Sequence, residues 1–262
     1  METMERTISE IDQDRVRRKF NRACSTYDES AVAQQQIARH LSAVWEMYQR
    51  KHGFQPTTAL EIGCGTGGFT RYLQSSCASA VWTLNDLYPA CAEKALRFCA
   101  ANTHFVCADA TAYPWIGPFE LIASSSVFQW FPAPGPFVQR LASCQKSGHV
   151  LLFSTFLPGN LGEIRELTGQ GLVYPSAWQW RDWLSSLYDM EHIEESEIRL
   201  LFSSPKAVLR HLKETGVTGN HAEFWTPGRL RAFSAAYQER FGTVNQQVTL
   251  TYRPLYVLAV RK

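Results

Sequence analysis

The chain has 262 residues, 45% of them hydrophobic and 19% charged, a composition that is ordinary for a globular enzyme. This length allows one large α/β domain, or one domain with an inserted subdomain, and needs neither disulfides nor a structural metal for a stable core. The net charge of +2 is too small to predict nucleic-acid binding by itself.

Two helices are predicted before a glycine-rich stretch, at residues 11–24 and 29–51. The second has a stripe of apolar residues at helical spacing, namely Ile37, Leu41, Val44, Trp45 and Tyr48. Gly53 supplies a stop signal after this helix, and Pro56 prevents its continuation.

From Thr58 onward, short apolar runs alternate with helical windows. The predicted strands are residues 59–62, 80–84, 104–107, 119–123 and 150–155, and the predicted helices between them are 69–75, 89–101 and 137–143. Strands that are apolar along their length and alternate with helices indicate a parallel sheet covered on both faces.

Beyond Phe156 the pattern changes. Helices are predicted at 161–168, 176–188, 205–215 and 227–241, with a strand at 198–202. Two final strands, 248–253 and 255–260, meet at Pro254 and are expected to close the sheet as an antiparallel edge pair. The predicted fold is a doubly wound, mostly parallel α/β sheet of Rossmann-like type, with an antiparallel terminal strand pair and an inserted helical lid.

The predicted organisation has four parts. Residues 1–53 form an N-terminal helical cap, 54–158 a cofactor-binding core, 159–245 a mostly helical lid or substrate region, and 246–262 the closing strands of the core sheet. The third part is assigned to a lid because so long a connection exceeds a normal crossover between strands.

The segment 59–70, Ala-Leu-Glu-Ile-Gly-Cys-Gly-Thr-Gly-Gly-Phe-Thr, indicates a strand, a glycine loop and the start of a helix. Glycines at such a turn permit positive φ and let the backbone approach a ligand without a Cβ collision. The spacing of Gly63, Gly65 and Gly68 also fits the dinucleotide fingerprint, so the loop alone does not identify the ligand.

Three carboxylates at the ends of successive strands narrow the choice of ligand for this loop. Glu61 suits the sulfonium and amino groups of S-adenosylmethionine and would repel a pyrophosphate. Asp86 is placed to accept both ribose hydroxyls, and Asp109 lies beside the expected position of the adenine amino group. Because ligands bind at the carboxyl ends of strands in open α/β sheets, the three together predict S-adenosylmethionine as the cofactor.

On these residues the chain resembles the class I methyltransferases. Their first motif, Glu-x-Gly-x-Gly-x-Gly, is matched by Glu61, Gly63, Gly65 and Gly67. The resemblance implies a cofactor site made of Tyr27, Glu61, Gly63, Cys64, Gly65, Gly67, Asp86, Leu87, Asp109, Ala110, Ser124 and Ser125.

The fourth-strand motif departs from that family at two positions. Ser124 and Ser125 are included because the family's residues after this strand border the methionine part of the cofactor. The more usual Asp of the motif is Glu120 in this chain, and the position often held by Asn is Ser125.

A narrower resemblance, to the malonyl-[acyl-carrier protein] O-methyltransferases of biotin biosynthesis, covers nearly the whole chain in short pieces. The matching pieces are residues 18–28, 31–36, 38, 128–130, 153–163, 211–216 and 250–253. This resemblance implies methyl transfer from S-adenosylmethionine to the free carboxylate of a malonyl thioester on acyl carrier protein. Because that carboxylate is ionised near neutral pH, no general base is needed, and catalysis consists of positioning two bound groups and partly desolvating the carboxylate.

The same resemblance implies a cation for the malonyl carboxylate, and the candidates are Arg165, Arg181 and Lys213. Tyr27 is expected to close over the cofactor, with Gln35 or Gln36 nearby. The side chains of Trp178, Trp180 and Trp183 are divided between lid, core and solvent. Carrier proteins are acidic, so an N-terminal basic run is interpreted either as a docking patch or as a solvated helix face; it contains Arg15, Arg17, Arg18, Lys19 and Arg22.

Three alternatives remain open: a small-molecule carboxylate O-methyltransferase of the trans-aconitate type, an NAD(P)-dependent reductase using the same loop, and a cofactor-binding subunit that activates a partner. Seven scattered cysteines without metal-ligand spacing predict reduced thiols, no metal site and a cytoplasmic location. No signal peptide is recognised, and no apolar run is long enough to span a bilayer.

Overall fold

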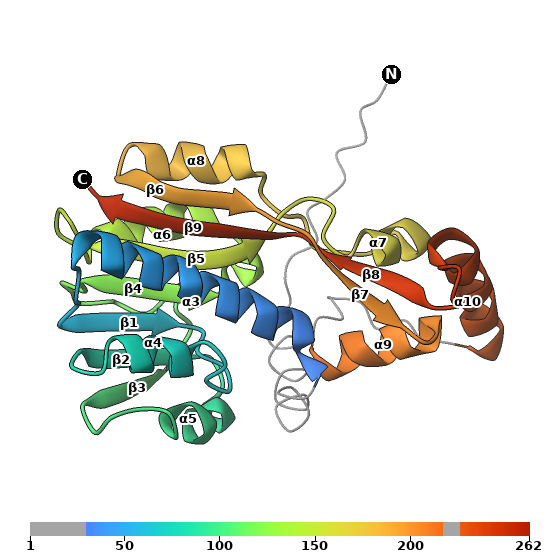
Figure 1. Cartoon of the computed structure of the whole chain (residues 1–262), viewed down its shortest axis with the longest axis horizontal. Helices are drawn as coiled ribbons and strands as arrows, with labels where there is room; N and C mark the ends of the chain where they lie inside the picture. The colour runs from blue at the N-terminus through green and yellow to red at the C-terminus, as the bar shows by residue number, and fades with distance from the viewer. Residues whose placement is uncertain (1–29, 217–225) are drawn as a thin grey trace.

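The computed structural model describes residues 30–216 and 226–262, with helices on both faces of a seven-stranded sheet (Figure 1). The sheet order is β3-β2-β1-β4-β5-β9-β6. Five consecutive parallel strands form most of it: β1 (Thr58–Ile62), β2 (Val81–Asp86), β3 (Thr103–Cys107), β4 (Leu121–Ser125) and β5 (Val150–Phe156). The predicted fold class is confirmed, whereas the helix expected at 11–24 lies outside the described residues.

Alternating side chains of the central strands supply the cores on the two sheet faces. On β1, Ala59 points to one core, while Leu60 and Ile62 point to the other. The fully buried β5 alternates in the same way, with Leu152 on the first face and Phe153 on the second. Burial on both faces explains why these strands are apolar along their whole length.

The first face is covered by α3 (Val32–His52), α4 (Thr70–Ser76) and α5 (Pro89–Leu96). The helix α3 ends where the sequence predicts, because Gly53 adopts a left-handed φ of 63° and donates its N–H to the Gln49 carbonyl at 2.8 Å. The predicted helix 89–101 is shorter in the structure. It ends at Leu96, and Asn102 ties the returning chain to the Ala80 carbonyl at 2.8 Å.

The second face is covered by α6 (Pro134–Ala142) and α8 (Ala177–Ser185). The fully buried Trp180 of α8 packs between the sheet and the turn after β4, with its ring centre 5.0 Å from that of Phe153 and 6.2 Å from that of Phe128. Trp183 is half-buried and contacts α6, whereas Trp178 is exposed. In the described structure, Trp180 and Trp183 therefore pack in the core.

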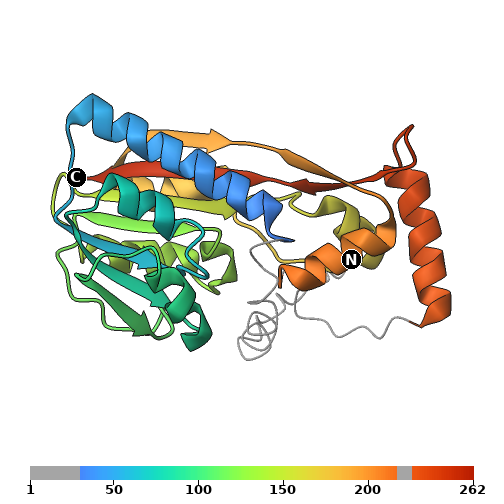
Figure 2. The same ribbon diagram turned by 60° about the horizontal axis from the view of Figure 1, so that its bottom comes forward.

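The predicted pairing of the last two strands is wrong in its partners. The strand β9 (Pro254–Arg261) lies antiparallel between β5 and a strand that was not predicted, β6 (Tyr188–Glu195). The preceding strand β8 (Val248–Tyr252) pairs with β7 (Ile198–Phe202) in a separate two-stranded sheet. Figure 2 shows these two long antiparallel runs extending from the main sheet toward α10.

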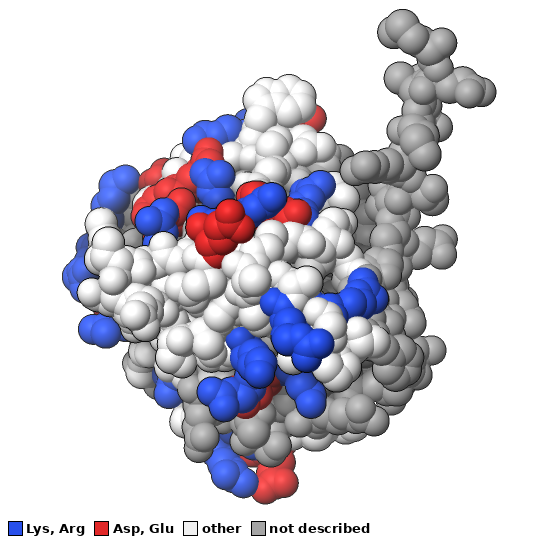
Figure 3. All heavy atoms as spheres, turned by 90° about the vertical axis from the view of Figure 1, so that its right-hand side faces the viewer, with Lys and Arg blue, Asp and Glu red and all other residues white. Residues whose placement is uncertain are grey.

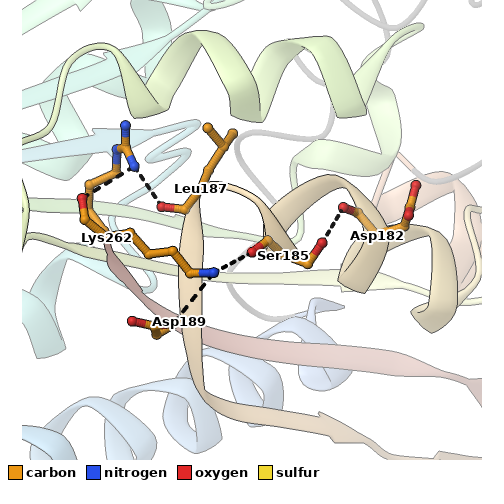
Figure 4. Close-up of polar contacts among 6 residues, drawn as sticks. Asp182, Ser185, Leu187, Asp189 and Lys262 are labelled. Atoms are coloured by element: carbon orange, nitrogen blue, oxygen red, sulfur yellow. Dashed lines mark hydrogen bonds and ion pairs between the residues drawn. The ribbon is translucent and has the colours of Figure 1, made fainter.

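The helix predicted at 176–188 ends three residues early because the chain turns into β6. Lys262 donates from Nζ to the Ser185 carbonyl at the end of α8, at 2.6 Å, and its ammonium lies 3.7 Å from the Asp189 carboxylate (Figure 4). Arg261 donates to the Leu187 carbonyl at 2.8 Å. A cation at a helix C-terminus and two bonds across the turn hold Tyr188 at the start of a strand.

A second body of structure surrounds the β7–β8 pair. It contains α7 (Gly162–Thr168), α9 (Pro205–Glu214) and α10 (Pro227–Phe241). The buried Glu163 of α7 accepts two hydrogen bonds from Thr251 of β8, at 3.2 Å from the backbone N–H and 2.6 Å from the hydroxyl. These bonds fix α7 on β8. The four-part division of the chain stays a prediction.

Within the described residues, no helix combines the length and the apolar character needed to cross a bilayer. Residues 30–216 and 226–262 also contain no cluster of three or more His, Cys, Asp or Glu side chains arranged to hold a metal ion.

Candidate functional site

A cavity lies at the carboxyl ends of the parallel strands, where the strand order reverses between β1 and β4. Each strand contributes to its wall: Gly63 after β1, Asp86 at the end of β2, Asp109 after β3, Ser125 on β4 and Phe156 on β5. A reversal of strand order leaves a crevice outside the strand ends, and open α/β sheets bind ligands there.

The glycines of the loop after β1 serve different purposes. Gly63 has a φ of 69°, and a Cβ atom on it would lie 2.3 Å from the Val127 side chain. Gly67, at φ 88°, is required for packing, since its Cβ would lie 2.7 Å from the Phe98 ring. Gly65 has a φ of 53° with open space around it, and it lines the cavity. Gly65 is therefore the position where the backbone faces the cavity with no side chain between it and a ligand.

This difference predicts that two alanine substitutions affect the protein differently, one mainly through stability and the other mainly through cofactor binding. Gly63→Ala is expected to lower the free energy of unfolding by about 2 kcal/mol or more, because it is overpacked and strained. Gly65→Ala is expected to cost about 1 kcal/mol of stability and to weaken cofactor binding at least about tenfold, since its Cβ enters the cavity. Thermal unfolding and calorimetric titration with S-adenosylhomocysteine measure both; equal cofactor affinity in Gly65→Ala would contradict the assignment.

Glu61 lies beneath the glycine loop and is 1% exposed. Its Oε2 atom has no hydrogen-bond partner among the described residues. Burial raises the pKa of this carboxyl to about 8, and the nearby Asp86 carboxylate acts in the same direction. A cation held at the adjacent turn would supply the missing counter-charge, so the site fits a ligand that is positively charged at this end.

Asp86 holds the glycine loop and the start of the next helix. Its Oδ2 accepts the Gly65 N–H at 2.8 Å, and its Oδ1 accepts the Tyr88 N–H at 3.0 Å. Burial raises the pKa of Asp86 to about 6, although these backbone N–H groups favour the ionised form. Each carboxylate oxygen has a second lone-pair direction, which leaves two acceptor positions for a ribose diol.

The wall near Asp109 is braced by neighbouring strand ends. Asn85 donates from its side chain to the carbonyls of Val106 and Ala108, at 3.0 and 2.9 Å, which fixes β2 against β3. Asp109 accepts the N–H and the hydroxyl of Thr111 at Oδ1, at 2.8 and 2.7 Å. Leu87 and Ala110, which also line the cavity as expected, supply apolar surface suited to a flat aromatic base.

Four of the expected cofactor residues that the structure describes lie outside the wall of this cavity: Glu61, which is buried behind the glycine loop, and Ser124, Cys64 and Gly67. Ser124 is fully buried and donates to the Ile62 carbonyl at 2.9 Å, so it ties β4 to β1. Cys64 faces a second pocket that adjoins the first at the glycine loop, and burial raises the pKa of its thiol. Gly67 packs against α5, while Tyr27 lies outside the described residues. Glu120, which stands where the family motif usually has Asp, does not line the cavity. Its carboxylate accepts the Thr57 N–H at 2.6 Å, before β1.

Gln34 was not predicted, yet it lines both pockets. Its Oε1 atom has no hydrogen-bond partner among the described residues. The residues named from the sequence were Gln35, which lines only the second pocket, and Gln36, which is exposed. The signal was available, because Gln34 lies three and four residues before the buried Ile37 and Ala38 and so shares their face of α3.

The far end of the cavity lies between the sheet and the segment after β5. Its wall contains Trp130, in the short 3₁₀ helix η1 (Phe128–Trp130), together with Leu172 and Tyr174. Asn160 joins two structures here: it donates to the Tyr174 hydroxyl at 2.9 Å and accepts the Arg253 N–H at 3.0 Å. Burial raises the pKa of Tyr174 to about 12, so its hydroxyl stays protonated.

The three candidate cations differ in position. Arg165 is exposed on α7, and its charge acts on the pKa of Tyr174, which places it beside the far end of the cavity. Lys213 is exposed near the end of α9, two residues before the cavity-lining Thr215. Arg181 is exposed on α8, and none of the three side chains lines the cavity wall. The roles of these residues stay predictions.

Comparison with known proteins agrees with this geometry. A family model described as a methyltransferase domain matches residues 32–218. The malonyl-[acyl-carrier protein] O-methyltransferase of Porphyromonas gingivalis is 41% identical over 254 residues, with 96% of this chain and 97% of the relative covered. The protein of the same description from Haemophilus influenzae is 34% identical, with 97% and 96% covered.

The chain belongs to the methyltransferase-domain family and, within it, to the family of the malonyl-[acyl-carrier protein] O-methyltransferases. Both resemblances stated from the sequence are thereby confirmed, as is S-adenosylmethionine as the cofactor. Solved structures show the same fold. The N-methyltransferase NodS of Bradyrhizobium japonicum, in complex with S-adenosylhomocysteine, matches 95% of this chain and 99% of its own at a TM-score of 0.57 and 12% identity. The Bacillus YcgJ protein matches 86% and 99% at a TM-score of 0.58 and 15% identity.

Proposed function

We propose that this protein methylates the free carboxylate of a malonyl thioester carried by acyl carrier protein, an early step of biotin biosynthesis. The printed descriptions of the relatives support this substrate. The observation that carries the proposal is the cavity itself, which continues from the cofactor residues to a wall of mostly apolar and aromatic side chains that includes the hydrogen-bonded pair Asn160 and Tyr174.

Bound S-adenosylmethionine supplies an electrophilic methyl group on a sulfonium. Asp86 would hold the ribose end of the cofactor, and Gly65 would let the backbone approach it, which positions the cofactor for transfer. The apolar wall at Trp130 and Leu172 suits a thioester arm and excludes water from the carboxylate.

The chemistry requires no proton acceptor. A malonyl carboxylate is ionised near neutral pH and attacks the methyl group directly. The buried His211 is engaged elsewhere, with its Nε2 2.8 Å from the Tyr252 hydroxyl, and burial lowers its pKa. Tyr174 stays protonated, so its hydroxyl serves as a hydrogen-bond donor for an anion rather than as a base.

Arg165 and Arg181 form a matched pair for testing the carboxylate-binding role. Arg165→Ala is expected to raise the KM for the malonyl thioester about tenfold, because it removes the cation beside Tyr174. Arg181→Ala, an equally exposed arginine on α8, is expected to leave the KM within about twofold. Initial rates with a malonyl thioester measure both constants. If both variants behave alike, Arg165 does not bind the substrate.

Transfer of labelled methyl from S-adenosylmethionine to malonyl-carrier protein, malonyl-CoA and trans-aconitate tests the proposal. Base-labile label on the carrier protein is the expected result, since the product is a methyl ester. Label only on trans-aconitate would establish the small-molecule alternative. Thermal stabilisation by NADH without methyl transfer would favour a reductase, and absence of turnover by the isolated chain would favour a cofactor-binding subunit.

Two further parts of the proposal rest on the sequence. The basic run Arg15, Arg17, Arg18, Lys19 and Arg22 is proposed to attract the acidic carrier protein, and it lies outside the described residues. A cytoplasmic location is proposed because none of the six described cysteines forms a disulfide.

A further inference from the structure

We propose that an exposed row of cations on α9, formed by Lys206, Arg210 and Lys213 and called here the α9 cation row, is a docking surface for the acidic carrier protein. This inference rests on the proposed function and adds the place where the partner binds.

The spacing puts the three cations on one side of the helix. They follow one another at intervals of four and three residues, which brings side chains to the same helical face. All three are exposed, and none makes an ion pair within residues 30–216 and 226–262. The opposite face is buried through Val208 and Leu212. Within the described residues, α9 is therefore held by its apolar face and not by the row.

The helices around the α9 cation row also carry a net positive charge. Together α9 and α10 contain six Lys and Arg residues against two Glu, whereas the whole chain has a net charge of only +2. One of the two, Glu214, is half-buried and accepts the Ser30 hydroxyl at 2.9 Å. Figure 3 views the end of the molecule that carries α10, and Lys and Arg side chains gather in its lower half with little acidic surface among them.

The row also leads to the active site. It covers about 10 Å of helix, at 1.5 Å per residue. Thr215 follows α9 directly and lines the cavity. A carrier protein seated on the row thus places the thioester arm at the end of α9 that borders the cavity. A small thioester without the carrier protein has no acidic surface for the row to contact.

The test compares charge reversal on two substrates. Lys206→Glu and Arg210→Glu are each expected to raise the KM for malonyl-carrier protein several-fold, and together about tenfold or more, with kcat unchanged. The KM for the malonyl thioester of N-acetylcysteamine is expected to stay the same. Added salt is expected to raise the carrier-protein KM of the parent enzyme and to affect the double variant less.

Lys146→Glu is the matched control, because Lys146 is exposed before β5, at the amino ends of the strands. It changes the net charge by the same amount as either single α9 variant, and it is expected to leave both KM values unchanged. Circular dichroism melting checks folding, and a Glu at position 206 lies in the first turn of α9, where negative charge is favourable.

Three results would overturn the docking surface: an equal rise in KM for the small thioester, an unchanged carrier-protein KM in the double variant, or an equal effect in Lys146→Glu. If reversal of Arg18 and Arg22 raises the carrier-protein KM while the α9 variants do not, the partner docks on the N-terminal run. If the parent enzyme methylates no malonyl thioester, the proposed function fails, and the α9 row fails with it as a carrier-protein site.

Discussion

Asp86→Ala is expected to weaken the binding of S-adenosylhomocysteine by about 10³-fold. This expectation rests on the predicted hydrogen bonds of the carboxylate to both ribose hydroxyls, since each hydrogen bond to a charged group contributes about 1.5–3 kcal/mol. The substitution also removes the acceptors for the N–H groups of Gly65 and Tyr88, which loosens the loop. Isothermal titration calorimetry measures the dissociation constant.

Asp182→Ala is a suitable control, because Asp182 is exposed on α8 and Ser185 bonds only to its backbone carbonyl. This variant is expected to bind the ligand as the parent does. A folded Asp86→Ala protein with normal affinity would remove Asp86 from the cofactor site.

Glu61 predicts an unusual dependence of stability on pH in the cofactor-free protein. Its pKa is raised from the ordinary 4.5 to about 8, so the folded state binds a proton that the unfolded state has released between these values. Stability is therefore highest at low pH within this window, and it falls on the order of a few kcal/mol as pH rises from 4.5 to 8. Denaturant unfolding at several pH values measures this fall. Glu61→Gln is expected to remove the part between about pH 6 and 8, and to leave the fall below about pH 6 that the raised pKa of Asp86 contributes.

The same carboxyl predicts a coupling between cofactor binding and proton release. The amino group and sulfonium of a cofactor bound beside Glu61 would favour its ionised form, so binding below pH 8 is expected to release its proton. The affinity for S-adenosylmethionine, which carries both positive charges, is expected to rise by up to about tenfold per unit between pH 6 and 8. Glu61→Gln is expected to bind more weakly and to lose the part of the pH dependence that Glu61 contributes. An identical pH profile in parent and variant would show that Glu61 does not face the cationic part of the cofactor.

Much of the cofactor site was predictable because its information is local. A buried parallel strand is recognisable as a short apolar run, and its carboxyl end must lie at the shared edge of the sheet. Asp86 and Asp109 follow two such runs directly, so their arrival at one cavity required no knowledge of the rest of the chain.

Other parts depended on contacts between distant segments. The strand β6 has the sequence Tyr-Asp-Met-Glu-His-Ile-Glu-Glu, whose charges are typical of an exposed edge and conceal its pairing with β9. The roles of Ser124 and Gly67 in packing depend on Ile62 and Phe98, which no pattern in their own neighbourhood reveals. The far wall of the cavity likewise needs Asn160 to meet Tyr174 across a turn.

The position of β9 also bears on how the protein folds during synthesis. This strand comes after every other strand of the main sheet in the chain, yet it lies inside the sheet, between β5 and β6. During synthesis, β5 therefore leaves the ribosome with an unpaired edge that only residues 254–261 can cover. Such an edge invites association with other chains, so folding is completed only after translation has passed Arg261.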